Sequence, residues 1–437
     1  MHDTLSDSAA ASVTHLPLTL HPDPSRVVLR PFVPADNPFA AAGDSSHVDD
    51  VVRRVMALDT NEVASRLRRV ERSLGGRHRN VKRVLERRFH DMIAPDSAHG
   101  PSPEQVRLIG AYFTEEYSFE AAALFNPSIV PHPDQSGAPE GGVRFVLSQR
   151  GVGEGHVSSI TFRTGTFGAD GGLTLDPPGQ YATSPRIESI PGGATDDPGV
   201  RLFYDGGAPL SAIVIFPVTL RQRHGIEDLR LTCFTEDDGK RVYLGTYTAF
   251  SGEAVREELL RTADFDSIEL EALRGRLAAA KGMALFPRRV NGYYAMLGRQ
   301  DHQNIWLLTS NDLYQWDRGA VAVRPQWPWE FVQMGNCGAP IEIDEGWLVL
   351  THGVGPVRNY CLGACLLDKA NPAKLLARTR EPLVAPDKQA RDGYVPNVVY
   401  SCGALAVGRR LLLPYGVADS YTAFATVDID ALLLAMA

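Results

Sequence analysis

The chain has 437 residues, of which 44% are hydrophobic and 22% charged, and its formal net charge is −8. The composition is ordinary for a globular protein, and the length allows one large β domain with an accessory segment, or two domains. The negative charge argues against a nucleic-acid-binding protein, which needs a basic surface to bind phosphates. No apolar run approaches the roughly 20 residues that span a bilayer.

The first 25 residues are polar, and we expect them to form a flexible N-terminus. They lack a basic segment followed by an apolar core, so we expect no signal peptide. The cysteines are odd in number and scattered, which is typical of reduced thiols in a cytoplasmic protein. A zinc site is the alternative, but no histidine cluster accompanies the cysteines, and we expect no metal. The five cysteines are Cys233, Cys337, Cys361, Cys365 and Cys402.

Residues 26–120 are predicted to form a docking strand followed by a helical extension. The stretch "SRVVLRPFVP" is typical of a strand, and from His47 to Met92 apolar residues recur at helical spacing. A further helix is expected in "PSPEQVRLIGAYFTEEYSFEAAAL". The many arginines of this segment suit a solvated helix face or salt bridges, and an interface of a homo-oligomer is the alternative.

From Phe125 onward, short apolar strands alternate with Gly, Pro and Asp turns. This pattern predicts an all-β domain over residues 121–437, as a sandwich or a propeller. A strand and a Ser/Thr-x-Asp turn recur in "VREELLRTADFDSIELEAL" and "QNIWLLTSNDLYQWDRG". Weak repeats of about 50 residues favour a propeller with five or six blades.

One hairpin of this domain begins with an unusual cluster of charges. "RLTCF", an Asp-Asp-Gly-Lys turn and "RVYLGTYTAF" predict a β-hairpin, and Glu227, Asp228 and Arg230 stand where its first strand begins. At the inner end of a propeller strand, such side chains point into the central cavity. The alternative is a turn-capping acidic pair with a surface arginine.

Five segments in order resemble glycoside hydrolase family 130, the β-mannoside phosphorylases and β-mannosidases. They are "GIEDLRLT…YLGTYTAF", "KGMALFPRRVNGYYAMLGR", "SNDLYQW", "GAPIEIDEGWLVLTHGV…YCLGACLLD" and "GYVPNVVYSCGAL…LLLPYGVADSYTAFATVDIDALL". The resemblance runs from Phe125 to the C-terminus and implies a five-bladed β-propeller. The N-terminal hundred residues exceed those of compact members, so the chain resembles an extended subgroup.

The resemblance implies that Asp228 is the general acid. The family's Glu-Asp-Pro-Arg motif matches Glu227-Asp228-Leu229-Arg230, with leucine in place of proline. Glycosidic cleavage needs a proton for the leaving oxygen, and we expect the neighbouring Glu227 to raise the pKa of Asp228. Arg230 is expected to orient Glu227 or the substrate.

The resemblance also implies a set of side chains that bind inorganic phosphate. Several convergent cations and donors are needed to hold this anion opposite the acid. For each candidate the alternative is a surface or strand-end residue, and after "YTAF" the nearest candidate for a family arginine is Arg256. The predicted set is Arg150, Arg163, Lys281, Arg299, His352 and Tyr360.

Asn126 and Asp419 match family positions that bind the non-reducing mannose, and Asp301 and Asn397 are secondary candidates. Carboxylates and amides suit this task because they bind vicinal hydroxyls. Trp316 is instead expected to pack within a blade. The glycines of "RGVGEGH" lack a surrounding βαβ unit, so we reject a nucleotide loop.

The sequence therefore predicts an inverting glycoside phosphorylase that converts a β-mannoside and phosphate into α-mannose 1-phosphate. Phosphate is the co-substrate, and no cofactor is expected. The retained Lys, Arg and His residues favour this function over an inverting β-mannosidase. A non-catalytic carbohydrate-binding propeller is the third alternative.

Overall fold

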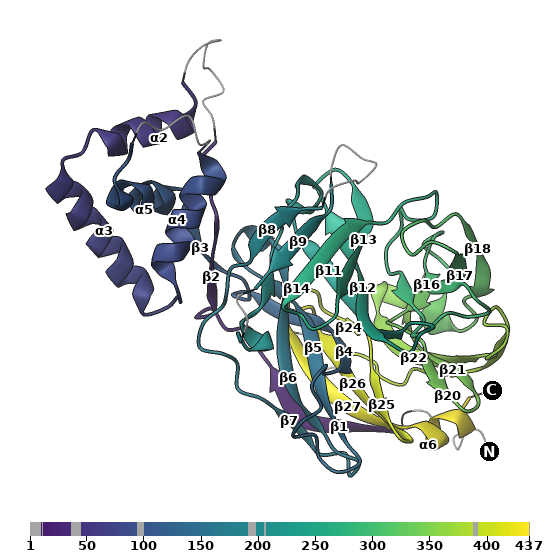
Figure 1. Ribbon diagram of the computed structural model, residues 1–437. Helices are drawn as coiled ribbons and strands as arrows, with labels where there is room; N and C mark the ends of the chain where they lie inside the picture. Colours follow the sequence, from purple (N-terminus) through teal and green to yellow (C-terminus); the bar gives the residue numbers. More distant parts are fainter. Residues whose placement is uncertain are drawn as a thin grey trace.

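The computed structural model describes residues 10, 12–35, 45–93, 100–190, 198–204, 207–387 and 392–436. Antiparallel β-sheets make up most of the regular secondary structure of these residues, with a group of helices near the N-terminus (Figure 1). Residues 1–9 and 11 of the predicted flexible N-terminus lie outside the described ranges. In the part of the chain that the structure describes, no helix is long and apolar enough to cross a membrane.

Five sheets contain four to six strands each. The first contains β4 (Ala123–Pro131), β5 (Val143–Val152), β6 (Ser158–Phe167), β7 (Leu173–Leu175) and β10 (Val214–Ile215). The second contains β8 (Arg186–Ser189), β9 (Val200–Phe203), β11 (Ile226–Thr235), β12 (Arg241–Phe250), β13 (Val255–Thr262) and β14 (Ser267–Ala272). The third contains β15 (Ala284–Leu285), β16 (Tyr294–Gly298), β17 (Ile305–Ser310) and β18 (Arg318–Val323).

The last two sheets complete the β region. The fourth contains β19 (Gln333–Asn336), β20 (Ile341–Ile343), β21 (Gly346–Val354), β22 (Tyr360–Leu367) and β23 (Leu375–Arg378). The fifth contains β1 (Val13–Leu20), β24 (Val399–Tyr400), β25 (Leu405–Val407), β26 (Arg410–Val417) and β27 (Tyr421–Asp428), and α6 (Ile429–Leu434) follows it.

Buried apolar clusters join each sheet to the next. Ile160 and Leu231 belong to a cluster between the first and second sheets, and further clusters lie between the second and third, third and fourth, and fourth and fifth. A last cluster, with Phe145 and Phe424, joins the first sheet to the fifth. The five sheets therefore pack in a closed cycle. Trp316 is fully buried in one of these clusters, as predicted.

The N-terminal strand β1 differs from the expectation for residues 1–25. Val13–Leu20 pairs with β27, so the two ends of the described chain share one sheet (Figure 1). Leu16, Leu18 and Leu20 alternate along β1 and pack on the cluster between the first and fifth sheets. This period of two is the ordinary pattern of a half-buried strand, so a flexible segment was the wrong prediction for Val13–Leu20.

The helices lie beside the sheets and are joined to them through a two-stranded ribbon (Figure 1). The ribbon pairs β2 (Val27–Pro31) with β3 (Thr114–Ser118). Helix α5 begins with a capping box at Ser102 and proline at its first turn, both of which favour a helix start. The helices are α2 (His47–Met56), α3 (Thr60–Gly75), α4 (Val81–Met92) and α5 (Pro103–Tyr112).

Candidate active site

Two β-bulges place Asn126 and Asp228 against each other. The ladder between β4 and β5 shifts register between Phe125 and Ser128, and the ladder between β11 and β12 shifts between Glu227 and Arg230. Asn126 (φ 48°) and Asp228 (φ 55°) are left-handed, a conformation that Asn and Asp tolerate better than other non-glycine residues. Asn126 Nδ2 donates to Asp228 Oδ1 at 2.7 Å. Bulges often aim side chains at active sites, and here they aim a carboxyl group and its donor together.

Glu227 lies between two of the predicted cations. Arg150 Nη2 is 2.9 Å from Glu227 Oε1, and Lys281 Nζ is 3.1 Å from Glu227 Oε2. Arg150 Nη1 also lies 3.6 Å from Asp228 Oδ1. The side chain of Asp228 is 20% exposed, so the carboxyl group is mostly buried and still reachable. Glu227 thus orders the cations that surround Asp228.

The surroundings of Asp228 contradict one prediction. Burial raises its pKa, but the charges of Arg150 and Arg230, the hydrogen bond from Asn126 and the charge of Lys281 together lower the pKa below its ordinary value. The expectation of a raised pKa for Asp228 is therefore wrong. The physical reason is that Glu227 is engaged with two cations, which outweigh its own negative charge.

Arg230 fixes the backbone around Asp228. It is 1% exposed and donates from Nη1 to the carbonyl oxygen of Asp228 at 2.9 Å. Its other contacts are Nη2 to the Tyr400 hydroxyl at 2.8 Å and Nε to the Cys337 carbonyl at 3.0 Å. No contact in the described residues joins it to Glu227, which it was expected to orient. Instead it holds the left-handed turn at Asp228.

A second group of predicted residues surrounds His352. Arg299 Nη1 lies 3.5 Å from His352 Nε2, and the ring of His352 is stacked 6.2 Å from that of Tyr360. Arg299 packs so closely over Gly282 and Gly335 that a methyl group at either position would collide with it. Because Gly282 follows Lys281, the backbone next to Lys281 adjoins Arg299, which in turn faces His352.

His352 is fully buried, and burial together with the charges of Arg299 and Arg230 holds its pKa well below the ordinary value. A neutral imidazole that faces the Arg299 donor at Nε2 carries its proton at Nδ1. That Nδ1 atom is buried with no hydrogen-bond partner among the described residues. Several neighbouring polar atoms share this state, namely Asn126 Oδ1, Arg150 Nε, Arg299 Nε and Asn336 Oδ1. Buried polar groups normally have partners, so this set marks a place suited to a polar ligand.

Asp419 and Asn397 lie on two turns that adjoin each other, since Ala418 N donates to Val398 O at 2.8 Å. Burial and the negative charge of Asp228 raise the pKa of Asp419 to about 6, against the opposing charges of Arg150 and Arg358. Asp419 and Asn397 are both left-handed. The carbonyl of Asn397 accepts from the backbone of Tyr360 at 2.9 Å, so its turn adjoins the His352 group.

Two predicted residues lie apart from these contacts. Arg163 is buried and donates to both carboxylate oxygens of Glu120 at 2.8 and 3.0 Å, so its guanidinium is held in an ion pair that Glu120 shares with Arg26. Asp301 is exposed and accepts from the side chain of Asn304 and from the backbone of Asn304 and Gln303, which stabilises a local turn. Against the opposing effect of partial burial, these hydrogen bonds lower its pKa to about 2. The predictions of phosphate binding for Arg163 and sugar binding for Asp301 therefore have no geometric support.

Three buried residues of the site were missed by the sequence analysis. Glu257 Oε1 accepts from the backbone of Gly282 at 2.6 Å and Met283 at 3.2 Å, and burial raises its pKa to about 7. Asn336 Nδ2 donates to the Gly282 carbonyl at 3.1 Å, and Tyr400 accepts from Arg230. "VREELL" and "MGNCG" carry polar residues inside apolar strands, a signal that could have indicated them.

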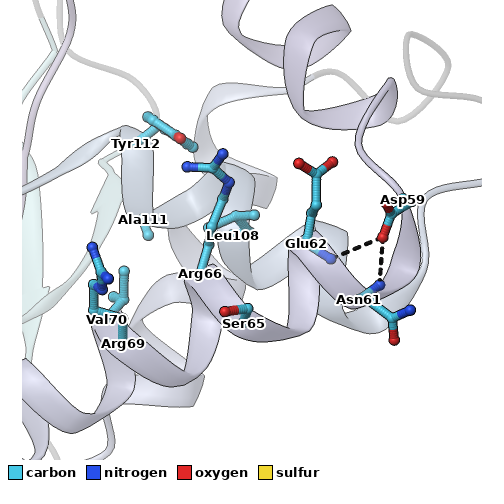
Figure 2. Close-up of a pocket in the computed structure, with 10 residues that line it drawn as sticks. All are labelled: Asp59, Asn61, Glu62, Ser65, Arg66, Arg69, Val70, Leu108, Ala111 and Tyr112. Carbon is cyan, nitrogen blue, oxygen red and sulfur yellow. Dashed lines mark hydrogen bonds between the residues drawn. The ribbon is translucent and has the colours of Figure 1, made fainter.

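A groove of about 690 Å³ lies elsewhere, between α3 and α5 (Figure 2). Leu108, Ala111 and Val70 form part of its lining, with Arg66 and Arg69 beside them. It contains none of the predicted site residues. Among the described residues, no group of three or more His, Cys, Asp or Glu side chains is arranged to hold a metal ion.

Comparisons with known proteins identify the family of the C-terminal half of the chain. Residues 210–437 match the family described as beta-1,4-mannooligosaccharide phosphorylase, glycoside hydrolase family 130. A beta-1,2-mannobiose phosphorylase of Listeria innocua is 32% identical over 229 residues, which are 50% of this chain and 62% of the relative. A beta-1,4-mannooligosaccharide phosphorylase of Ruminococcus albus is 36% identical over 158 residues, 33% of this chain and 47% of the relative. The chain thus spans less than two thirds of the length of these relatives.

Solved structures show the same fold. The Listeria innocua beta-1,2-mannobiose phosphorylase in complex with beta-1,2-mannobiose has a TM-score of 0.50 and 24% identity, and the match covers 73% of this chain and 92% of that one. A glycosyl hydrolase from Bacteroides ovatus has a TM-score of 0.52 and 17% identity, covering 72% of this chain and 87% of that one. Because the family match extends over more than half of the sequence, the chain belongs to glycoside hydrolase family 130.

Proposed function

We propose that this protein is an inverting phosphorylase that cleaves a terminal β-mannoside with inorganic phosphate and releases α-mannose 1-phosphate. One observation carries the proposal. Glu227, the neighbour of Asp228, forms an ion pair with Lys281, and Arg299 packs against the residue after Lys281 and faces His352. The similar phosphorylases of other organisms support the same reaction class.

In the proposed reaction, Asp228 gives its proton to the glycosidic oxygen as the bond from that oxygen to the mannose C1 breaks. A phosphate oxygen forms the new bond to C1 from the opposite face, which inverts the configuration. Asn126, with its unpartnered buried Oδ1, and Asp419 bind hydroxyl groups of the mannose. The leaving sugar keeps the proton, so charge and atoms balance without a cofactor.

Phosphate is proposed to bind beside Arg299. The guanidinium of Arg299 has no carboxylate partner among the described residues, whereas Arg150 and Lys281 are both paired with Glu227. Arg299 therefore supplies the positive charge, His352 Nδ1 supplies a donor, and Lys281 shifts from Glu227 when the dianion arrives. Charge-assisted hydrogen bonds of this type are the strong ones that hold phosphate.

The cycle of sheets is proposed to be a propeller with five blades, which is the finer form of the fold prediction. The clusters that join the first sheet to the second and the fifth back to the first support a closed ring. In such a ring the inner strands converge on one axis. This places Asn126 of β4 and Asp228 of β11 near the centre.

Phosphate-dependent release of sugar phosphate is the decisive test. A panel of β-mannosides with different linkages is incubated with and without phosphate, and mannose 1-phosphate and free mannose are quantified. We expect mannose 1-phosphate whose rate of formation saturates with phosphate. Free mannose formed at the same rate without phosphate would assign hydrolysis instead, with Asp419, whose pKa is raised to about 6, as the candidate base for a water nucleophile.

A further inference from the structure

Two hairpin loops of the molecule share a sequence pattern. The first joins β5 to β6 in "RGVGEGHVS" (150–158), and the second joins β21 to β22 in "HGVGPVRNY" (352–360). The strands stop pairing at matching positions, since Val152 pairs with Ser158 and Val354 with Tyr360. The first residue of each stretch, Arg150 or His352, belongs to the candidate active site.

The backbones of the two loops match as well. Gly153 N donates to Val157 O at 3.1 Å, and Gly355 N donates to Asn359 O at 2.9 Å. At the tips, the first pair of left-handed residues is Gly155 (φ 67°) and His156 (φ 58°). The equivalent pair in the second loop is Val357 (φ 57°) and Arg358 (φ 53°). The two loops therefore share one backbone conformation. The first left-handed position is glycine in one loop, Gly155, and valine in the other, Val357.

The second loop keeps an unfavourable conformation. A β-branched residue in the left-handed region is a genuine outlier, and glycine would relieve it. Val357 is 87% exposed, so burial of its side chain does not compensate for the strain. Strain of this type clusters at ligand-binding positions. The residue that the strained turn presents is Arg358.

Arg358 lies on the side of the candidate site that contains Tyr360 and Asp419. Its guanidinium carbon is 5.8 Å from the centre of the Tyr360 ring. Its charge also lowers the pKa of Asp419, which places it within electrostatic reach of that carboxyl group. Arg358 is exposed, and among the described residues no carboxylate forms an ion pair with it.

The tip of the first loop meets a third exposed residue. The ring of His156 lies 5.8 Å from that of Tyr394, tilted by 31°, and Tyr394 is 71% exposed. The segment after Tyr394 is fixed to the site, because Val395 N donates to Ala418 O at 3.0 Å. Ala418 directly precedes Asp419, so both loop tips border the turn of Asp419.

We propose that His156, Arg358 and Tyr394 form the binding surface for the leaving sugar, which is a neutral hexose or a short chain of hexoses. This inference rests on the proposed function and extends it from the mannose that is transferred to the sugar that is released. Tyr394 and His156 offer ring faces for the apolar face of a sugar, and Arg358 offers donors to its hydroxyl groups. The strained turn at Val357 holds Arg358 in place for this contact.

The reverse reaction tests the proposal, because it separates the two sugars. α-Mannose 1-phosphate is the donor, and mannose or β-mannobiose is the acceptor. We expect Tyr394→Ala, His156→Ala and Arg358→Ala each to raise the KM for the acceptor by roughly two- to tenfold, the range of one aromatic or polar contact. The KM for α-mannose 1-phosphate should stay within about twofold of the parent. His156→Phe should restore acceptor KM, and Tyr112→Ala, an exposed tyrosine on α5, is the matched control.

Calorimetric titration with β-mannobiose supplies a readout that needs no turnover. An unchanged affinity in all three alanine variants would overturn the inference, whatever reaction the protein catalyses. If the parent instead releases free mannose from β-mannosides without phosphate, the proposed phosphorolysis fails separately. In that case the KM of the same variants for β-mannosides is measured. A KM above that of the parent supports the binding surface, and a KM equal to that of the parent rejects it.

Discussion

Replacing Glu257 with glutamine should change how the stability of the protein depends on pH. Glu257 is fully buried on β13, and its carboxylate accepts from the backbone of Gly282 and Met283, directly after Lys281. Burial raises its pKa from 4.5 to about 7, although Arg230, the two backbone donors and Arg299 oppose this. Glutamine has almost the same shape, can still accept from Gly282 and cannot titrate.

The sign of the effect follows from proton binding. Between pH 4.5 and 7 the folded protein keeps a proton on Glu257 that the unfolded chain has lost. Stability therefore falls as the pH rises through this window, by about 1.4 kcal/mol for each unit of pKa difference. The difference between 4.5 and about 7 corresponds to about 3 kcal/mol in total. In the Glu257→Gln variant this contribution is absent.

Thermal unfolding at pH 5 and pH 8 measures the difference. The unfolding entropy of a chain of this length makes 1 kcal/mol worth about 1 °C if it unfolds as one unit. We expect the midpoint of the parent to fall about 3 °C more than that of Glu257→Gln between the two pH values. Glu253→Gln, whose side chain is 85% exposed, is the control and should follow the parent. Parallel curves for the parent and Glu257→Gln would refute the assignment of the raised pKa to Glu257.

Three further outcomes are expected. Asp228→Asn should lower kcat by about 10²–10⁴-fold. Its thermal midpoint should change little, because asparagine tolerates the left-handed backbone and can still accept from Asn126, and activity within a few-fold of the parent would assign the acid elsewhere. Lys281→Ala should raise the KM for phosphate more than tenfold and the KM for the mannoside only slightly, whereas equal effects on both would exclude a phosphate ligand. If the helices form an oligomer interface, Arg66→Glu with Arg69→Glu should reduce the size of the protein in solution without loss of activity; an unchanged size at every concentration would reject that role.

Local patterns in the sequence predicted much of the fold. The hairpin of β11 and β12 was predicted from alternation on either side of an Asp-Gly turn, and the structure confirms it with Thr235 opposite Arg241. The strand β1 carries the same alternation, but its sequence "VTHLPLTL" contains a proline and a histidine and lies in a polar N-terminus, so it was not predicted as a strand. Its partner β27 lies about 400 positions away, and no local rule reports a pairing at that distance.

The sequence predicted candidate site residues that act through their own charge. It predicted less well the residues whose role depends on partners that the fold brings next to them. Lys281, Arg299 and His352 were predicted from motifs, and in the structure Arg299 faces His352 and packs against the glycine that follows Lys281. The prediction that Arg163 binds phosphate has no geometric support because Glu120, from a different segment, already holds its guanidinium in an ion pair. Glu257 was missed because its role depends on a backbone turn that only the folded chain brings to it. Partners distant in sequence decide which cations remain available to a ligand.

The lowered pKa of Asp228 and its proposed role as an acid can be reconciled through phosphate. Two of the cations that lower this pKa, Arg150 and Lys281, are members of the predicted phosphate-binding set. A bound dianion would compensate their charge and repel the Asp228 carboxylate, so the pKa of Asp228 should rise when phosphate binds. Arg230 and Asn126 remain in place and limit the rise.

This coupling predicts a pH profile that depends on phosphate. An acid must be protonated, so activity should fall as the pH rises through the pKa of Asp228. At phosphate well above its KM, the pH at which activity falls should be higher than at phosphate well below its KM. In Lys281→Ala the two profiles should differ less, since one of the compensated charges is gone. If the parent loses activity at the same pH at both phosphate concentrations, the cations around Asp228 do not couple its proton to the anion, and its protonation must depend on the sugar instead.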